Sequence, residues 1–398
     1  MFPPEEHEYR LDRFVTIDLE TSVKNTGQWA IGNHKASPFH PDNNIVLFGM
    51  CGPEPGDVWV TDNPAVDLTI NHTTNYTVVG QNLKFDMLYL LQKFPALGWA
   101  YMKTAKLWDT MIVEYLLTAQ EDSMISLDRL AVKYGLPLKP GNIKDYWDQG
   151  IDTEDIPVEE LTEYLKHDVE VTHEVALAQY EEAKEQNMLP LITSQMEALR
   201  AVILMENNGL YLNGVKLMEG YKEAERDVKE LHMHLQDEVR NNTAASIASS
   251  HINFNSPSQI LTLYNGGSFE WSEKVIRIGP DSQPLLYKSG NRVGEPRMKK
   301  NKVVFPWGGL MPPGHSLPNT THDTLASVHK QLKPSVTKDI MFLILELRGL
   351  EKQLNTYWSK YQQLRWHDGC LHHTLNQAIT ATGRLSSSKP NLQQVTGA

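Results

Sequence analysis

The most constraining feature of this sequence is the alternation of short β-rich runs with helix-like segments over its first half. The runs "RFVTIDLE", "NNIVLFGM" and "YTVVGQN" are rich in residues that favour strands, whereas "KFDMLYLLQKF" has helical spacing. From Pro157 onward, apolar residues recur on one side of a polar segment, which predicts a long helix. Strands that alternate with helices predict an α/β fold, in which helices cover a mixed sheet.

The second half of the chain has a different pattern. Helical periodicity is present over residues 228–239 and again over residues 340–361, which predicts two long helices. Residues 241–330 between them are rich in Gly, Pro, Ser and Asn, so we expect mainly loops there. One helix is predicted within this stretch, because "SPSQ" at residues 256–259 combines a cap, a first-turn proline and a capping-box glutamine.

Acidic and basic residues are distributed unevenly along the chain. Residues 1–190 contain 14 basic and 31 acidic residues, a net charge of −17, whereas residues 191–398 contain 23 basic and 18 acidic residues, a net charge of +5. Together with the change of pattern, this asymmetry predicts a domain boundary near residue 190. We expect the acidic half to bind metal and the basic half to bind a polyanion.

The bulk composition is typical of an intracellular globular protein. With 398 residues and 40% hydrophobic residues, the chain can bury ordinary cores in two or three domains. It has two cysteines, Cys51 and Cys370, and no charged-then-apolar leader, which indicates a reducing compartment without a disulfide framework. No apolar run approaches the length of a membrane span. We therefore expect a cytoplasmic protein without a membrane partner.

Three short motifs carry the acidic chemistry of the first half. In "FVTIDLETS", strand alternation puts Asp18 and Glu20 on the same face. In "VVGQNLKFDMLYL", a strand runs through a glycine turn into a helix whose first turns carry Asp86. In "EYLKHDVEV", Tyr164 and Asp168 share a helix face at i and i+4. Taken singly, each motif is common, as a solvated strand end, a carboxylate favoured by a helix dipole, and an ordinary helix surface.

In this order, the motifs resemble the three exonuclease motifs of the 3′→5′ proofreading nucleases, over roughly residues 10–185. The resemblance implies a ribonuclease H-like fold, and Tyr164 places the chain in the tyrosine branch of that family. It further implies that Tyr164 handles the attacking water, that Leu19 and Asn82 contact the terminal nucleotide, and that Asp109 is structural. Metal binding is assigned to the four acids Asp18, Glu20, Asp86 and Asp168.

A cluster of four carboxylates requires cations, because the acids repel one another when they converge. All-oxygen ligand sets favour Mg²⁺ or Mn²⁺ over zinc. Two such ions about 3.5–4 Å apart can clamp an in-line phosphoryl displacement, one by activating water and the other by stabilising the leaving 3′ oxygen. A tyrosine hydroxyl, with an ordinary pKa of about 10, is suited to orienting that water rather than to acting as a free base.

The end of the chain carries a second and more specific resemblance. The run "QAITATGRLSSSKPNLQQV" resembles the segment of family A DNA polymerases that precedes the first catalytic aspartate of the palm. "LRAVILMENNGLYLNGVKL" and "LELRGLEKQLNTYWSKY" resemble that family's entry into the polymerase domain and its thumb-to-palm passage. Because Asp18 lies close to the start, the short phage-type polymerases are the nearest match. The resemblance implies that Arg384 touches primer and template, and that a basic run in the thumb grips duplex phosphates through Lys299, Lys300 and Lys302.

These resemblances predict the N-terminal part of a family A DNA polymerase that proofreads during DNA replication. Residues 1–190 would form the 3′→5′ exonuclease domain, which takes a single-stranded DNA 3′ end. Residues 191–398 would form a partial polymerase domain, whose thumb binds the primer–template duplex. The palm aspartates and the fingers helix are expected beyond Ala398. The sequence leaves open whether the chain is a fragment or one half of a split polymerase whose partner is a C-terminal polypeptide.

Two other functions are compatible with parts of the sequence. A free-standing 3′→5′ exonuclease acting on DNA or RNA would use the same four acids, but it would not explain the polymerase-like run at the end of the chain. A non-enzymatic DNA-binding subunit would not require intact exonuclease motifs. Hydrolysis of a labelled single strand distinguishes all three.

Overall fold

The structure is a computed structural model, and it describes residues 9–24, 36–54, 56–63, 76–139, 143–245, 248–280, 282–288 and 293–394. The chain divides into two compact units. One comprises Met1–Gly214 together with Lys360–Ala398, and the other comprises Val215–Ser359. The described residues from Lys360 onward therefore pack with the first half of the chain. The predicted domain boundary near residue 190 stays a prediction.

A five-stranded mixed sheet lies at the centre of the first unit, as the alternation of runs predicted. The strands are arranged in the order β3–β2–β1–β4–β5. The central strand β1 pairs antiparallel with β2 and parallel with β4. The strands are β1 (Phe14–Thr21), β2 (Ile45–Cys51), β3 (Val58–Thr61), β4 (Thr77–Gly80) and β5 (Lys106–Asp109).

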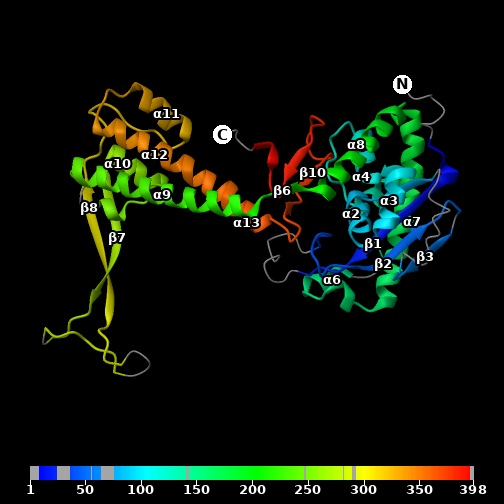
Figure 1. The fold of residues 1–398 in the computed structure, drawn as a ribbon, viewed down its shortest axis with the longest axis horizontal. Coiled ribbons are helices and arrows are strands. Elements are labelled where there is room, and N and C mark those ends of the chain that lie inside the picture. The colour runs from blue at the N-terminus through cyan, green and yellow to red at the C-terminus, as the bar shows by residue number, and fades with distance from the viewer. Residues whose placement is uncertain are drawn as a thin grey trace. The chain divides into compact units, whose positions relative to one another are not determined.

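Helices cover both faces of this sheet (Figure 1). The long helix predicted from Pro157 is α7, which packs against β1, β2, β3 and β4 through a core that includes Leu47 and Leu165. On the opposite face, Ile17 of β1 shares a core with Leu90 of α2 and Met196 of α8. The helices of this unit are α2 (Lys84–Lys93), α3 (Pro95–Thr104), α4 (Thr110–Leu117), α5 (Leu127–Tyr134), α6 (Ile143–Asp148), α7 (Val158–Glu185) and α8 (Leu189–Asn208).

Gly49 of β2 allows α7 to lie close to the sheet. A Cβ atom built on this glycine would lie 2.8 Å from Leu165 Cγ and 3.0 Å from Val169 Cγ1, both on α7. Gly49 is the register partner of Asp18 on the neighbouring strand. The close approach therefore occurs beside Asp18, and it brings the next turn of α7, which carries Asp168, to the same part of the sheet.

The C-terminal segment of the first unit contributes short strand pairs. Strand β9 (Cys370–Leu371) pairs with β6 (Leu210–Tyr211), and β10 (Thr374–Asn376) pairs with β11 (Ser386–Ser388). The hydroxyl of Tyr115 in α4 donates to the carbonyl oxygen of Thr380 at 2.6 Å.

A buried ion pair also ties this C-terminal segment to the first half of the chain. Lys84 Nζ of α2 lies 2.7 Å from Glu206 Oε1 of α8, and the same carboxylate oxygen accepts the backbone N–H of Leu375 at 2.5 Å. Lys84 Nζ also donates to the carbonyl oxygen of Leu375. One lysine and one glutamate thus connect two helices to β10.

The second unit is mainly helical, as the periodicity over residues 228–239 and 340–361 predicted. Leu235 and Val239 share its core with Ile340, Ile344 and Leu347. Its helices are α9 (Gly214–Asn242), α10 (Pro257–Asn265), α11 (His322–Gln331) and α12 (Val336–Gln353), followed by a π-helical turn (Leu354–Trp358). The next helix, α13 (Ser359–Leu364), belongs to the first unit from Lys360 onward.

The expectation of mainly loops over residues 241–330 was wrong, chiefly because this stretch contains a long β-hairpin. Strands β7 (Gly267–Ile276) and β8 (Met298–Trp307) form a regular antiparallel hairpin. Apolar pairs face the core only at its base, where Phe269 lies opposite Phe305 and Trp271 opposite Val303. Because the apolar alternation covers only these few residues, the sequence pattern is weak there.

Helix α10 begins at Pro257, as "SPSQ" predicted, but the predicted capping box does not form. Ser256 makes no side-chain capping bond, and its Oγ instead lies 3.0 Å from Ser258 Oγ. Gln259 Oε1 accepts the backbone N–H of Asn253 at 2.6 Å. The start of the helix was predicted correctly. The predicted role of Gln259 was wrong, because its side chain binds the backbone of Asn253 instead.

Among the helices that the structure describes, none combines the length and the apolar character that crossing a membrane requires.

Candidate active site

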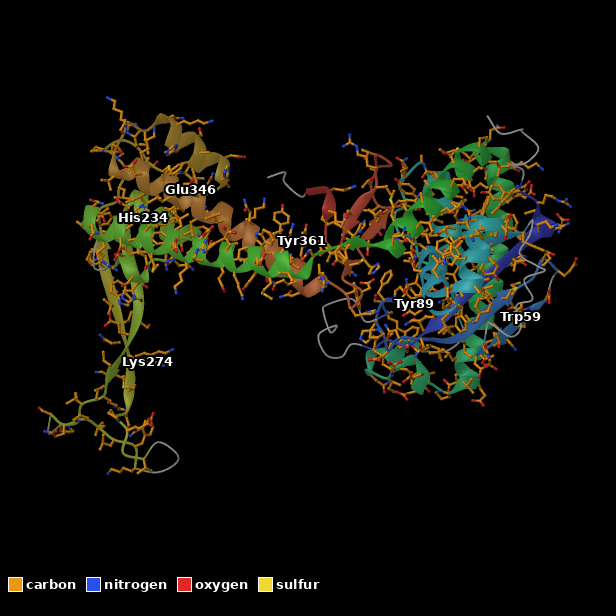
Figure 2. All side chains as sticks on the ribbon, viewed as in Figure 1. Trp59, Tyr89, His234, Lys274, Glu346 and Tyr361 are labelled. Carbon is orange, nitrogen blue, oxygen red and sulfur yellow. The ribbon has the colours of Figure 1, made fainter. Side chains whose placement is uncertain are left out.

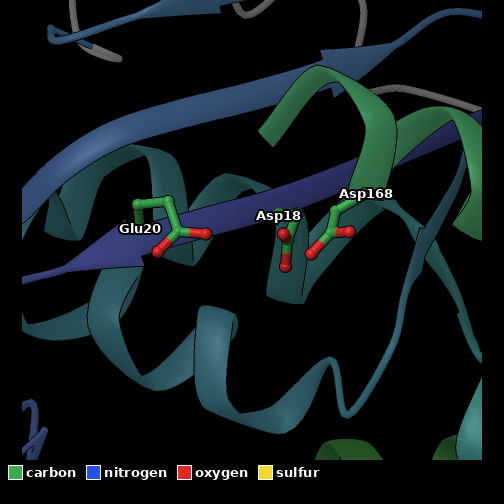
Figure 3. Close-up of side chains that lie close together, drawn as sticks. All are labelled: Asp18, Glu20 and Asp168. Carbon is green, nitrogen blue, oxygen red and sulfur yellow. The ribbon is translucent and has the colours of Figure 1, made fainter. Parts of the chain in front are cut away.

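The structure brings three of the four predicted acidic residues together. Asp18 and Glu20 lie on one face of β1, and Asp168 reaches the same place from α7 (Figure 3). One carboxylate oxygen from each lies within 4.8 Å of one from each of the others. The predicted pairing of Asp18 with Glu20 on one strand face is thereby confirmed.

A local irregularity of the sheet accompanies this cluster. The register between β1 and β2 shifts between Glu20 and Thr21. Such irregularities bend a strand and change the direction of its side chains, and they are frequent beside active sites. Strand alternation alone put Glu20 on the face of Asp18, but it contained no signal for this shift.

Asp86 lies near the cluster without belonging to that close group of three. It sits in the first turn of α2 and is 2% exposed. Burial raises the pKa of its carboxyl well above the ordinary value, and the negative charge of Asp18 raises it further. Its Oδ1 atom is buried and has no hydrogen-bond partner among the described residues. Asp86 therefore lies close enough to Asp18 for their charges to interact, and its Oδ1 atom can accept a further ligand.

The other carboxyl pKa values in the cluster are also raised. Burial, followed by the charge of Asp168, raises the pKa of Asp18 to about 8. Burial, followed by the charges of Asp18 and Asp168, raises the pKa of Glu20 well above its ordinary value. These shifts mean that the carboxyl groups resist ionising together unless a cation compensates them.

The cluster fits divalent metal ions by two observations. All its ligand atoms are carboxylate oxygens, the set that Mg²⁺ and Mn²⁺ prefer. Asp86 Oδ1 and Asp168 Oδ1 are both buried without a hydrogen-bond donor among the described residues. Buried acceptor atoms of this kind are costly unless a ligand satisfies them.

Tyr164 lies at the edge of the cluster, one helical turn before Asp168 on α7. Burial, followed by the charge of Asp168, raises the pKa of its hydroxyl to about 12. The hydroxyl therefore stays protonated at neutral pH. A protonated phenol can orient a water molecule by hydrogen bonding, but it cannot act as a free base.

Lys139 is a site residue that the sequence interpretation missed. Its Nζ atom lies 2.6 Å from Tyr164 Oη and 2.6 Å from Asp168 Oδ2. Burial lowers the pKa of Lys139, but the charges of Asp168 and Tyr164 raise it more, so the ammonium group stays charged. No spacing rule links a lysine that follows α5 to two residues of α7, so the sequence carried no signal for this contact.

Asn82 and Asp109 shape the approach to α2. Asn82 has a positive φ of 58°, a left-handed conformation that asparagine tolerates better than most residues. Its backbone N–H donates to Asp109 Oδ1 at 3.3 Å, and the same carboxylate oxygen caps α4 by accepting from the backbone N–H groups of Met111 and Ile112. Asp109 is therefore structural, as expected, and it holds Asn82 in place.

Leu19 faces the acidic residues with its backbone and not with its side chain. Its side chain is 5% exposed and lies in the hydrophobic core, on the strand face opposite Asp18. Burial raises the pKa values of Asp18 and Asp86, and backbone hydrogen bonding by Leu19 to these carboxyl groups offsets part of that rise. The side chain of Leu19 thus leaves little surface for a nucleotide. The predicted contacts of Leu19 and Asn82 with the terminal nucleotide both stay predictions.

A cavity of about 780 Å³ opens beside Tyr164 and Lys139. Its walls include three further cationic side chains, Arg129, Lys133 and Lys144, and the aromatic ring of Trp147. Cationic and aromatic side chains in one groove are the combination that binds single-stranded nucleic acids, because they hold phosphates and stack on bases.

The remaining predicted DNA contacts lie away from the acidic cluster in the chain. Arg384 of the first unit is exposed, and its backbone oxygen accepts from Thr380 Oγ1 at 2.7 Å. The predicted basic run, residues 288–302, lies partly in β8 of the second unit rather than in a loop, which corrects the expectation for Lys299, Lys300 and Lys302. Arg292 of that run lies outside the described residues.

In the hairpin of the second unit, two positively charged side chains lie opposite each other on β7 and β8. Lys274, labelled in Figure 2, is the register partner of Lys300. Like charges directly opposite each other destabilise a sheet. Two positions along β8 on the same face, Lys302 pairs with Glu270 at 2.8 Å.

Comparison with known proteins gives two family matches. Residues 69–179 match the family described as 3′-5′ exonuclease, and residues 303–397 match the family described as DNA polymerase family A. The first match contains α2 and most of α7, and the second contains part of β8, all of α12 and the short C-terminal strands.

Curated relatives are DNA polymerases I of bacteria. The chain is 25% identical to DNA polymerase I of Borreliella burgdorferi over 85% of its own length and 27% identical to that of Synechocystis over 80%. It is 37% identical to the thermostable DNA polymerase I of Thermus filiformis over 32% of its length. The chain spans only 31%, 27% and 15% of these relatives, respectively.

One solved structure has a similar fold across almost the whole chain. It is the POL domain of Pol1 from M. smegmatis, in complex with DNA primer-template and dNTP. The TM-score is 0.60 at 17% sequence identity, and the match covers 98% of this chain and 53% of that one. At this identity, the comparison concerns the fold alone.

Proposed function

We propose, because residues 69–179 belong to the 3′-5′ exonuclease family and residues 303–397 to DNA polymerase family A, that this chain removes nucleotides from DNA 3′ ends by metal-dependent hydrolysis. The activity would serve proofreading by a family A DNA polymerase. The observation that carries the proposal is the convergence of Asp18, Glu20 and Asp168 in one cluster of carboxylates, with Asp86 beside them.

The four acids would hold two divalent ions, Mg²⁺ or Mn²⁺. Bound ions of this type supply an activated water and stabilise the charge of the leaving 3′ oxygen. Asp18, Glu20 and Asp168 provide oxygen atoms within reach of one another, and Asp86 offers a buried oxygen that lacks a donor. The same ions would relieve the repulsion that raises the carboxyl pKa values.

Tyr164 would orient the attacking water, because its hydroxyl stays protonated at neutral pH and lies one turn from Asp168. The end of the DNA strand would lie against Asn82 and in the cavity beside Tyr164. The cationic side chains that line this cavity suit the strand's phosphates, and Trp147 suits a base.

An end-labelled DNA primer with a mismatched 3′ end tests the proposal. We expect the purified chain to shorten this primer with Mg²⁺ and not to extend a matched primer when nucleotides are supplied. Extension needs a second set of metal-held carboxylates at the primer end. Among the described residues, the one group of three that could hold an ion is Asp18, Glu20 and Asp168.

Three outcomes decide between the candidate functions. No shortening would favour the non-enzymatic DNA-binding subunit, whereas a preference for RNA ends would favour the free-standing exonuclease. Template-directed extension by this chain alone would contradict the predicted partial polymerase domain. Under the split-polymerase hypothesis, addition of a polypeptide that carries the palm and fingers would restore extension.

The hairpin of the second unit would bind duplex phosphates. Lys274 and Lys300 lie directly opposite each other, and an anionic ligand would remove the cost of that repulsion. Lys299 and Lys302 extend the positive charge along β8. A primer–template duplex supplies phosphates along such a ribbon.

Neutralising three hairpin lysines should flatten the salt dependence of duplex binding. For the variant with Lys299, Lys300 and Lys302 changed to alanine, we expect the slope of log K against log salt to fall by about 0.9 for each phosphate that the protein no longer neutralises. Fluorescence anisotropy with a labelled duplex at several salt concentrations measures this slope.

The matched control for the hairpin variant changes three exposed lysines of the first unit, Lys103, Lys166 and Lys184, to alanine. It removes the same charge and should leave the slope within about 0.5 of the value for the parent protein, which is less than the effect of one phosphate. Equal slopes for the hairpin variant and the parent would remove the hairpin from the DNA interface.

A further inference from the structure

Lys139 bridges the two residues of α7 that the proposed hydrolysis needs most. Its Nζ atom is 2.6 Å from Asp168 Oδ2 and 2.6 Å from Tyr164 Oη. The ammonium group also lies 4.4 Å from the centroid of the Tyr164 ring. The Lys139 side chain is only 25% exposed, so these contacts hold it in a restricted place.

We propose that Lys139 is a positioning residue, which orients the Tyr164 hydroxyl so that it donates its hydrogen to the attacking water. The inference rests on the proposed function, since it assumes hydrolysis at the acidic cluster. It assigns to Lys139 a role that neither the exonuclease motifs nor the acidic ligand set contains.

The directions of the hydrogen bonds determine what the Tyr164 hydroxyl can do. An ammonium group only donates, so Tyr164 Oη must accept from Lys139 Nζ. The hydroxyl hydrogen of Tyr164 is then left to donate in another direction. A tyrosine without this lysine would be free to rotate its hydroxyl and to use it as acceptor or donor.

The second bond fixes where the ammonium group lies. Lys139 Nζ donates to Oδ2 of Asp168 and leaves Oδ1, which has no donor among the described residues. Asp168 Oδ1 therefore stays available to a metal ion while Lys139 binds Oδ2. Asp168 anchors Lys139, and Lys139 in turn orients Tyr164, so the three side chains form a chain of contacts that ends at the site.

Simple charge compensation is the competing explanation. Lys139 would then only reduce repulsion among the acids, and bound metal would take over that task. Under that explanation, a variant without the ammonium group should hydrolyse DNA normally once Mn²⁺ is saturating. Under the positioning role, hydrolysis should stay slow at any Mn²⁺ concentration, because the metal cannot orient Tyr164.

The experiment compares K139M with K139R, Y164F and the double variant K139M/Y164F. At saturating Mn²⁺, we expect K139M to lower the single-turnover rate by about 10–100-fold, a usual loss for a partner that orients a metal-site residue. K139R keeps a cationic donor and should recover part of the rate. K139M should slow the Y164F protein little further, because residues that act through one another are not additive.

Two further measurements complete the test. K166M removes an exposed lysine from the same helix as Tyr164 and should hydrolyse DNA at the parent rate. Calorimetric titration with Mn²⁺ should show that K139M still binds the ion, with an affinity within about tenfold of the parent.

The outcomes separate this inference from the proposed function. A parent protein that neither binds Mn²⁺ nor hydrolyses DNA would contradict the proposed function. If the parent does both, a normal rate for K139M, additive effects of K139M and Y164F, or loss of Mn²⁺ binding by K139M would each overturn the positioning role.

Discussion

Asp18→Ala is expected to abolish Mg²⁺-dependent hydrolysis of a DNA 3′ end while leaving the fold and single-strand binding nearly intact. Asp18 shares the cluster with Glu20 and Asp168, so its removal takes away one of the three carboxylates that would hold the proposed ion. The fold should survive, because the change also removes a carboxyl group whose ionisation the site opposes. Gel analysis of a labelled strand and circular dichroism measure the two effects.

The same variant should also change the pH dependence of stability in the absence of metal. Because its pKa is raised from 3.8 to about 8 in the folded protein, Asp18 favours the folded state when protonated. This contribution is fully present below pH about 4 and is lost as the pH rises through about 8. In EDTA, the melting temperature of Asp18→Ala should therefore fall less than that of the parent between about pH 4 and 8.

Asp12→Ala is the matched control, since Asp12 is an exposed carboxylate just before the same strand. It should hydrolyse DNA at the parent rate. Undiminished hydrolysis by Asp18→Ala with Mg²⁺ present would show that Asp18 is not a metal ligand of the active site.

Tyr164→Phe is expected to slow hydrolysis by roughly 10²–10⁴-fold, as is typical for the loss of a positioned group that handles protons. The substitution removes only the hydroxyl and keeps the ring, which makes an edge contact with Trp147 at a centroid distance of 6.3 Å. Metal affinity should change little, because the hydroxyl contacts Lys139 and not the acidic ligands directly. Single-turnover kinetics and Mn²⁺ calorimetry measure the two quantities.

Tyr146→Phe is the control for the removal of a phenol hydroxyl in the same region. Tyr146 Oη lies 3.3 Å from both carboxylate oxygens of Glu160 in an exposed pair, so its loss should leave the rate unchanged. If Tyr164→Phe instead loses Mn²⁺ binding, Tyr164 maintains the structure of the site and does not orient water.

Sequence periodicity predicted the elements that hold the acids. β1, α2 and α7 form where the alternation and the helical spacing placed them, because each has a regular apolar face that packs on the sheet. The long hairpin of the second unit was missed for the converse reason. Most of its residues face solvent, so only the pairs around Phe269 and Trp271 carry the apolar alternation.

The candidate site was predictable as a set of acids, but not as a geometry. Strand alternation placed Asp18 beside Glu20, whereas the approach of Asp168 depends on Gly49, which lets α7 lie close to β2. Lys139 reaches Asp168 and Tyr164 only through the tertiary fold. Contacts between side chains far apart in the sequence leave no periodic signal, and these were the ones missed.

The discontinuous first unit has a consequence for biosynthesis. Its two parts are separated by Val215–Ser359, which a ribosome must synthesise before it reaches residue 360. At about 5–20 residues per second, this delay is on the order of 10–30 s. During that time, Glu206 lacks the backbone donor of Leu375, and Tyr115 lacks its acceptor at Thr380. The first unit of the nascent chain therefore lacks these contacts until the short C-terminal strands have been synthesised.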